Sequence, residues 1–194
     1  MARDRKARPE ADALRLFVAV ELTPDALAAV DDALAPWRES FPRARWVPPE
    51  NRHVTVKFLG RTWPRLRGWV EERVATAAAS VSPFETTLTQ LGAFPSPRRA
   101  RVLWVGLDDA PGRMAEVALA LDAALASEFR PETRAFTPHL TVARSDPPLE
   151  LPAAFVAAPV RPVRFRVHHV VVFRSHLRRP APRYEPLASF PLGA

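Results

Sequence analysis

The sequence predicts an α+β fold, because β-rich runs are interspersed with amphipathic helical stretches and some of these runs follow one another like hairpins. The chain has 194 residues, enough for one domain or for two closely packed lobes. A His-apolar-Thr-apolar pattern occurs twice, as HVTV at 53–56 and as HLTV at 139–142. Each copy follows a predicted helix and a proline-bearing connector. This echo predicts two related lobes that face each other across a cleft.

The first half of the chain predicts two helices and two strands around the first motif. Thr23 and Pro24 combine an N-cap residue with a proline at the first helical position, so a helix begins there. Apolar residues then recur at helical spacing. In chain order we expect a flexible basic tail over 1–13, a strand over 15–22, a helix over 24–39, an extended piece at RARWV, a strand at HVTVKFL closed by Gly60, and a helix from Trp63 to about residue 80.

The second half predicts a hairpin, a helix and further strands. Two β-rich runs flank the segment PSPRRA, which indicates a long hairpin with a basic tip. We expect residues 14–194 to form a single bilobal domain. Its remaining predicted elements are strands over 84–94 and 101–108, a helix from Pro111 to Leu125, a strand at HLTVAR, a short helix within the proline-rich segment 145–160, and strands over 163–174 and 184–190.

The composition is that of a folded protein, with 47% hydrophobic and 25% charged residues. No stretch approaches the roughly 18 consecutive apolar residues of a membrane span, and no signal-peptide core follows the N-terminus. The absence of cysteine excludes disulfides, thiolate catalysis and zinc–cysteine sites. We therefore expect a cytoplasmic protein with no membrane partner, and a monomer as the default state.

The formal net charge of +7 favours a polyanionic partner. All but two of the 28 basic residues are arginine, and the chain also holds 22 prolines. Such a composition can equally reflect a GC-rich genome. The charge therefore supports a nucleic-acid partner without identifying one.

The paired motifs place four functional groups on strand faces. Side chains alternate along a strand, so His53 and Thr55 leave one face, as do His139 and Thr141 in the second copy. If both strands line one cleft, one neutral imidazole can take a proton while a charged one gives a proton up. Threonine hydroxyls can donate hydrogen bonds to phosphate oxygens. This set suits phosphoryl chemistry without a metal.

Other readings of the motifs compete with this one. A single His-x-Thr strand is usually structural, but two copies among five histidines strengthen the catalytic interpretation. Neither motif contains a carboxylate, so a metal-dependent phosphoesterase fits less well. A non-catalytic RNA-binding module with an inherited cleft is a further alternative, which the net charge fits equally well.

Six blocks along the chain carry a family resemblance. They are RLFVAVEL, RWVPPENRHVTVKFLG, LGAFPSPRRARVLWVGL, FTPHLTVAR, VVVFRSHL and RYEPLASFPL. Together they resemble the two-histidine (2H) phosphoesterase superfamily, and within it the RNA 2′,3′-cyclic phosphodiesterases first known as 2′–5′ RNA ligases. The resemblance implies a bilobal fold with two mainly antiparallel sheets, flanked by helices and related by a pseudo-twofold axis around a central cleft. It also implies no metal cofactor.

The resemblance also implies an activity, the hydrolysis of a 2′,3′-cyclic phosphate to a 2′-phosphomonoester, with RNA ends or small cyclic nucleotides as substrates. His53 would be the proton donor to the departing 3′ oxygen, and His139 the proton acceptor from water. Thr55 and Thr141 would hold the phosphate. Ligation of 2′–5′ RNA ends, the reverse reaction, is the alternative outcome at the same site.

Arg144 completes HLTVAR and is a candidate phosphate ligand by the same resemblance. Strict alternation puts its side chain on the face opposite His139, so it reaches the cleft only if the strand bends or ends there. Further candidates have a structural interpretation that is at least as strong, as a solvated hairpin tip for the arginines and as core or scaffold, the preferred interpretation, for the aromatic residues. They are a basic rim of Arg98, Arg99 and Arg101, and a base-stacking set of Trp46, Phe58, Phe94 and Tyr184. We interpret His168, His169 and His176 as structural.

Overall fold

The strands form one hydrogen-bonded path, β7-β4-β5-β6-β3-β1-β8-β9, and β2 pairs with β6 beside it. The computed structural model describes residues 13–109, 112–178 and 181–193. The predicted tail, except for Ala13, lies outside the described residues. The strand bounds are β1 Leu14–Val20, β2 Arg45–Trp46, β3 Val54–Thr62, β4 Phe84–Phe94, β5 Ala100–Leu107, β6 His139–Leu149, β7 Arg164–Val167, β8 His169–His176 and β9 Arg183–Pro191.

The sheet consists of two antiparallel halves that meet at one point. β7, β4, β5 and β6 form one half, while β3, β1, β8 and β9 form the other. The inner strands β3 and β6 carry the two motifs and are joined by a single residue pair, Val54 with Leu140. The two predicted sheets are therefore the two halves of one continuous antiparallel sheet.

The chain crosses between the halves, so neither half is a continuous piece of sequence. Each motif strand follows a helix, in the order β1-α1-β3 and again in the order β5-α3-β6. After β3 the chain enters β4 in the other half, and after β7 it enters β8, which pairs with β1. The pseudo-symmetric units therefore exchange strands, which fastens the halves to each other.

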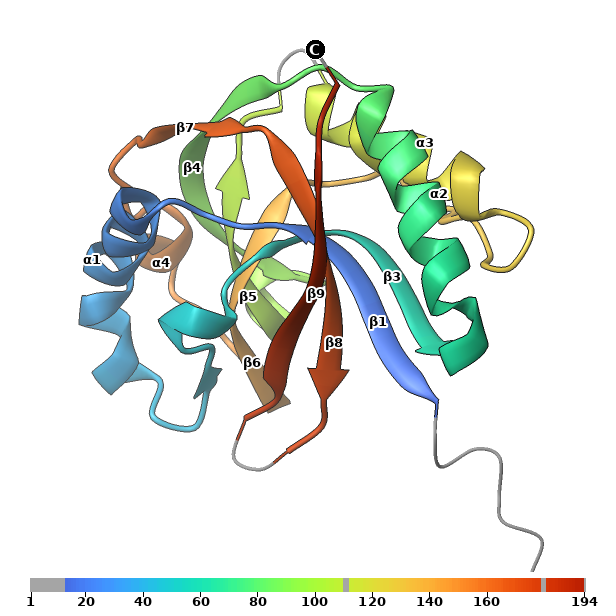
Figure 1. Cartoon of the computed structure of the whole chain (residues 1–194). Helices are drawn as coiled ribbons and strands as arrows, with labels where there is room; N and C mark the ends of the chain where they lie inside the picture. The colour runs from blue at the N-terminus through green and yellow to red at the C-terminus, as the bar shows by residue number, and fades with distance from the viewer. Residues whose placement is uncertain (1–12, 110–111, 179–180, 194) are drawn as a thin grey trace, which may run out of the picture.

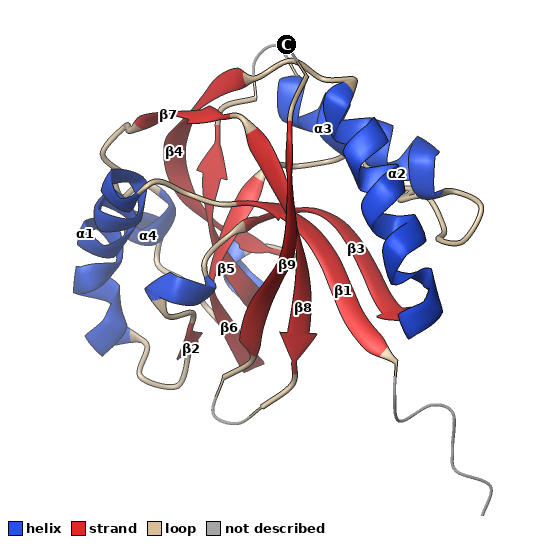
Figure 2. Ribbon diagram, in the orientation of Figure 1, coloured by secondary structure: helices blue, strands red, loops and turns tan. Residues whose placement is uncertain are grey.

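The helices lie in two groups, α1 with α4 on one side and α2 with α3 on the other (Figures 1 and 2). Trp37 of α1 contacts Phe155 of α4, with ring centroids 5.3 Å apart. α2 packs against α3, which in turn packs against β3. The helix bounds are α1 Pro24–Ser40, α2 Arg67–Ala79, α3 Arg113–Leu125 and α4 Ala153–Val156.

Strand alternation separates a core face from a cleft face. Leu16, Val18 and Val20 of β1 are buried in the main core under the helices. Phe17 of the same strand belongs to a second buried cluster on the opposite face, with Ala19, Val171 and Phe173. Thr23 caps α1 as predicted, accepting a hydrogen bond from the Ala26 backbone N–H at 3.4 Å. Within the described residues no helix is long and apolar enough to cross a membrane.

The helix predicted from Trp63 begins at Arg67, after a 3₁₀ turn over Pro64–Leu66. Three strand predictions also differ from the structure. The single strand predicted over 163–174 is two strands, β7 and β8, which lie in opposite halves of the sheet. β6 continues to Leu149, into the proline-rich segment where only a helix was expected. β3 also continues past Gly60, which lies beside a register shift with φ +66°. In each case the cause is a pairing partner distant in sequence, which local patterns do not reveal.

Gly92 of β4 is required by the close approach of Trp104, its partner on β5. A Cβ atom at position 92 would overlap the indole ring of Trp104. We expect Gly92→Ala to lower the free energy of unfolding by roughly 1–3 kcal/mol, because the indole must shift. Gly68→Ala in α2 is the matched control, since no atom lies within 4 Å of its Cβ position. Equal urea unfolding midpoints for the two variants would contradict the prediction.

Candidate active site

The junction between β3 and β6 sets the direction of both motifs. Val54 and Leu140 lie directly opposite each other and are fully buried. Opposed residues of an antiparallel pair point to the same face, here the core. Their neighbours on both strands therefore point to the other face. This places the imidazoles of His53 and His139 and the hydroxyls of Thr55 and Thr141 on one side of the sheet.

These four residues and Arg144 line one pocket, a cavity of about 290 Å³. The structure thus brings together every residue that the sequence analysis assigned to the site. The remaining lining residues come mainly from β1, β3 and the β8–β9 hairpin. Lining residues that the sequence analysis missed include Arg15, Phe17, Asn51, Ser175, Leu177 and Pro182. Of these, only Phe17 had a signal in the sequence. It lies between two apolar residues of RLFVAV, so strand alternation predicts an apolar side chain on each face.

A β-bulge turns Arg144 into the pocket. Leu103 pairs with Ala143 and Trp104 with Thr141, which leaves Val142 as an extra residue in β6. Val142 and Ala143 are both buried, so the alternation shifts by one residue and Arg144 joins the face of His139. The condition set by the sequence analysis, a bend in the strand, is met by this bulge.

The first motif carries the same bulge in β3. Ala19 pairs with Thr55 and Val18 with Lys57, which leaves Val56 as the extra residue. Phe58 is thereby placed on the pocket face, at the position equivalent to Arg144. Its side chain is 69% exposed at the pocket lining, so its interpretation as a core residue was wrong. The pseudo-symmetric halves thus offer the pocket a cation on one side and an aromatic ring on the other.

Both histidines are held through the same nitrogen. His53 Nδ1 lies 2.9 Å from the Asn51 carbonyl oxygen, and His139 Nδ1 lies 2.7 Å from that of Thr137. A carbonyl oxygen can only accept, so Nδ1 carries hydrogen in each ring. The second nitrogen, Nε2, is therefore the one available to exchange a proton with a substrate.

The two imidazoles have different surroundings. His53 stacks on Phe17 with centroids 4.7 Å apart and meets the edge of Tyr184 at 5.0 Å. Burial, with a smaller contribution from the Arg144 charge, lowers the pKa of His53 to about 4. Burial also raises the pKa of Tyr184, which therefore keeps its hydroxyl proton at neutral pH. His139 instead contacts the edge of Phe94, with centroids 5.1 Å apart.

Two buried cations anchor the first motif on its core side. Arg52 is 5% exposed and donates to Asp31 of α1 at 2.7 Å. Lys57 is 6% exposed and pairs with Asp122 of α3, while its Nζ also donates to the Arg130 carbonyl oxygen at 2.9 Å. Removing one partner of a buried ion pair leaves an uncompensated charge. These pairs therefore fix the strand between His53 and Phe58 against both helix groups.

Asn51 links the first motif to the far rim of the pocket. Its backbone carbonyl accepts from His53, and its side-chain nitrogen donates to the Pro182 carbonyl oxygen at 2.8 Å. Pro182 immediately precedes β9, which carries Tyr184. One residue thus orients the imidazole and attaches the β8–β9 hairpin that encloses it.

Other candidates from the sequence lie elsewhere. Arg98, Arg99 and Arg101 do not line the pocket, and Arg101 pairs with Asp146. Among the proposed stacking residues, Phe58 and Tyr184 line the pocket, whereas Trp46 and Phe94 do not. His169 and His176 lie near Glu21 and Glu185 respectively.

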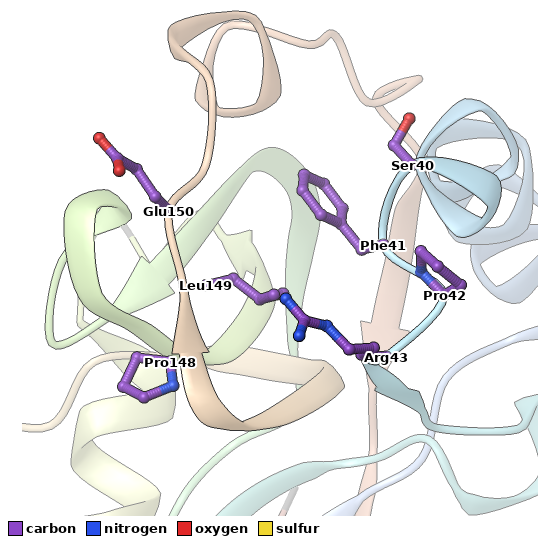
Figure 3. Close-up of a pocket in the computed structure, with 7 residues that line it drawn as sticks. All are labelled: Ser40, Phe41, Pro42, Arg43, Pro148, Leu149 and Glu150. Atoms are coloured by element: carbon purple, nitrogen blue, oxygen red, sulfur yellow. The ribbon is translucent and has the colours of Figure 1, made fainter.

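A second pocket lies apart from the two motifs, between the end of α1 and the end of β6 (Figure 3). It is lined by Ser40, Phe41, Pro42, Arg43, Pro148, Leu149 and Glu150, and contains none of the predicted site residues. In the part of the chain that the structure describes, no group of three His, Asp or Glu residues is placed to hold a metal ion.

The fold and the paired motifs are those of a two-histidine phosphoesterase, and comparison with known proteins gives the family. The family model described as the 2′-5′ RNA ligase superfamily matches residues 16–179. The chain belongs to this superfamily. The RNA 2′,3′-cyclic phosphodiesterase of Methanothermobacter thermautotrophicus is 33% identical over 135 residues, which cover 68% of this chain and 71% of that protein.

Another curated relative is longer than this chain. The RNA 2′,3′-cyclic phosphodiesterase of Geobacillus stearothermophilus is 31% identical over 179 residues, 91% of this chain. The match covers 56% of that protein, so the chain spans little more than half of its length.

Solved structures confirm the predicted fold class. The protein TT0787 of Thermus thermophilus aligns with a TM-score of 0.75 at 28% identity, covering 92% of this chain and 97% of that one. Escherichia coli LigT in its apo form shares the fold, with a TM-score of 0.75 at 23% identity and coverage of 94% and 99%.

The lowered pKa of His53 predicts a pH-dependent stability. The folded state binds this proton only below about pH 4, whereas an unfolded histidine binds it near pH 6.5. The stabilising contribution is therefore complete above pH 6.5 and is lost as the pH falls towards 4. We expect it to fall by about 1.4 kcal/mol per pH unit, up to roughly 3 kcal/mol in total.

Urea unfolding of the wild type and of His53→Gln at several pH values tests this expectation. The unfolding free energy of the wild type, relative to that of His53→Gln, should fall steadily from pH 6.5 to pH 4. Parallel curves would show that the imidazole is not desolvated in the folded protein.

Proposed function

We propose that the chain hydrolyses 2′,3′-cyclic phosphate ends of RNA to 2′-phosphomonoesters, by general acid–base catalysis and without a metal ion. The observation that carries the proposal is that both imidazoles line one pocket while their Nδ1 atoms are engaged by backbone carbonyls. Two imidazoles, each held through Nδ1, line one pocket together with two threonines and Arg144. The names of the curated relatives support this choice of substrate.

In the proposed reaction, His139 Nε2 accepts a proton from a water molecule whose oxygen attacks phosphorus. The bond from phosphorus to the 3′ oxygen breaks, and His53 Nε2 donates its proton to that oxygen. Thr55, Thr141 and Arg144 hold the non-bridging oxygens, where negative charge accumulates. Each proton transfer contributes typically about 10²–10⁴ to the rate. The product is a 2′-phosphomonoester with a free 3′ hydroxyl.

The donor role requires that His53 gain a proton when substrate binds. In the empty site its lowered pKa leaves the ring neutral at pH 7, through burial and then through the Arg144 charge. A bound phosphodiester adds a negative charge beside the imidazole and neutralises the repulsion from Arg144. Both effects raise the pKa of His53. The substrate anion thus promotes the protonation that the leaving oxygen needs.

The apolar rim of the pocket suits the nucleoside. Phe58 and Leu177 both line the pocket and are 69% and 71% exposed. Exposed apolar side chains at the mouth of a polar site offer a surface on which a base can lie. We therefore place the terminal base against this rim, with its phosphate towards the two histidines.

The activity is tested with a short RNA that ends in a 2′,3′-cyclic phosphate, incubated in the presence of EDTA. We expect the wild type to form a 2′-phosphate, identified by phosphorus NMR. The variants His53→Ala and His139→Ala should lose about 10²–10⁴ in rate. Turnover that stops with EDTA and returns with a divalent cation would contradict the metal-free mechanism. A lack of turnover with RNA still bound would favour a binding module.

The donor and acceptor roles are separated by a substrate with a better leaving group. A 4-nitrophenyl phosphodiester releases a phenolate that needs little protonation. His53→Ala should therefore be impaired much less on this ester than on the cyclic phosphate. His139→Ala should be impaired on both, because water must still be activated. The opposite pattern would exchange the two roles.

A further inference from the structure

Two arginines lie directly opposite each other at the edge of the pocket. Arg45 of β2 pairs with Arg144 of β6 in antiparallel register, so both side chains leave the same face of the sheet. Both are exposed. Like charges directly opposite in a ladder destabilise it. The nearby carboxylate of Asp146 is engaged by Arg101, and among the described residues no carboxylate forms an ion pair with Arg45 or Arg144.

The strand that carries Arg45 is held in place from the core side. The Val47 backbone N–H donates to the Val142 carbonyl oxygen at 2.8 Å, at the bulge of β6. Trp46 points to the opposite face and packs against the main core. The backbone of Arg45 is therefore held in a fixed position beside Arg144. A fixed starting position reduces the entropy that binding a ligand costs.

The two arginines differ in their relation to the pocket. Arg144 lines it with both histidines, whereas Arg45 lies outside the lining, one strand further away. Opposed side chains leave the sheet about 5 Å apart at Cβ, and two long guanidinium groups can then reach separate anions. A nucleic-acid strand supplies such anions in succession. Phosphate contacts of this kind depend on charge and not on base sequence.

We propose that Arg45 binds the phosphodiester on the 5′ side of the terminal nucleotide, so that the site prefers RNA ends to 2′,3′-cyclic mononucleotides. This inference rests on the proposed function, which assigns the terminal phosphate to Arg144 and the histidines. A cyclic mononucleotide has no phosphate on its 5′ side and leaves Arg45 without a ligand. Arg45 thereby distinguishes RNA ends from cyclic mononucleotides without contacting the reacting phosphate.

The test compares kcat/KM for a 2′,3′-cyclic mononucleotide with kcat/KM for a short RNA that ends in the same nucleotide. Arg45→Gln should lower the ratio of RNA to mononucleotide by roughly three- to tenfold. Arg45→Lys, which keeps the charge, should recover part of the loss. With RNA, the slope of log kcat/KM against log salt should become shallower by about 0.7, as expected for one lost contact to a single strand.

Arg43→Gln is the matched control, because Arg43 lies two residues away but lines the second pocket (Figure 3). It should leave the substrate ratio at the wild-type value. A ratio in Arg45→Gln that stays at the wild-type value would overturn the inference, whether activity on both substrates is retained or is lost equally. Thermal unfolding of each variant identifies a loss that comes from instability.

Failure of the proposed function gives a different result. In that case the wild type would turn over neither substrate, and kinetic ratios would not exist. Binding of a 3′-phosphorylated RNA and of a nucleoside 3′-phosphate, measured by competition, then decides the role of Arg45. Weaker binding of the RNA alone by Arg45→Gln supports the inference, whereas unchanged binding of both ligands contradicts it.

Discussion

The pairing of Val54 with Leu140 is the constraint on which the site depends. It is the single residue pair by which the two sheet halves are joined in the described structure. Because both residues are buried, the histidine and threonine on either side of each must face the cleft. A slip of one residue at this junction would turn one motif into the core and separate the four groups. The exchange of strands between the halves holds that register.

Two matching bulges make the site asymmetric within a pseudo-symmetric frame. Each motif strand has an extra residue after its threonine, Val56 in one and Val142 in the other. The next cleft-facing residue is an aromatic ring in the first half and a guanidinium in the second. The imidazoles differ as well, because an aromatic cluster partly buries His53 and lowers its pKa. Two motifs with the same His-x-Thr pattern therefore have different surroundings.

Buried ion pairs on the core side of the first motif hold its cleft-facing side chains in position. Arg52, just before β3, and Lys57, within it, extend to carboxylates on α1 and α3, which belong to different helix groups. Charges at such depth are tolerated only when they are paired and hydrogen-bonded. The pairs thus tie the position of His53 to the packing of both helix groups. The backbone beside Arg45 is held separately, by the hydrogen bond from Val47 to the bulge of β6.

The sequence by itself determined the α+β class, the cap of α1, the hairpin and both motif strands, and it singled out five candidate site residues, because periodicity and short motifs are local properties. It could not determine that residues 163–174 form two strands in opposite halves, or that Arg144 reaches the pocket. Those features depend on which distant strand pairs with which, and on where an extra residue enters the ladder. The exposure of Phe58 and the burial of His53 were likewise decided by tertiary packing, since neighbours distant in sequence set both.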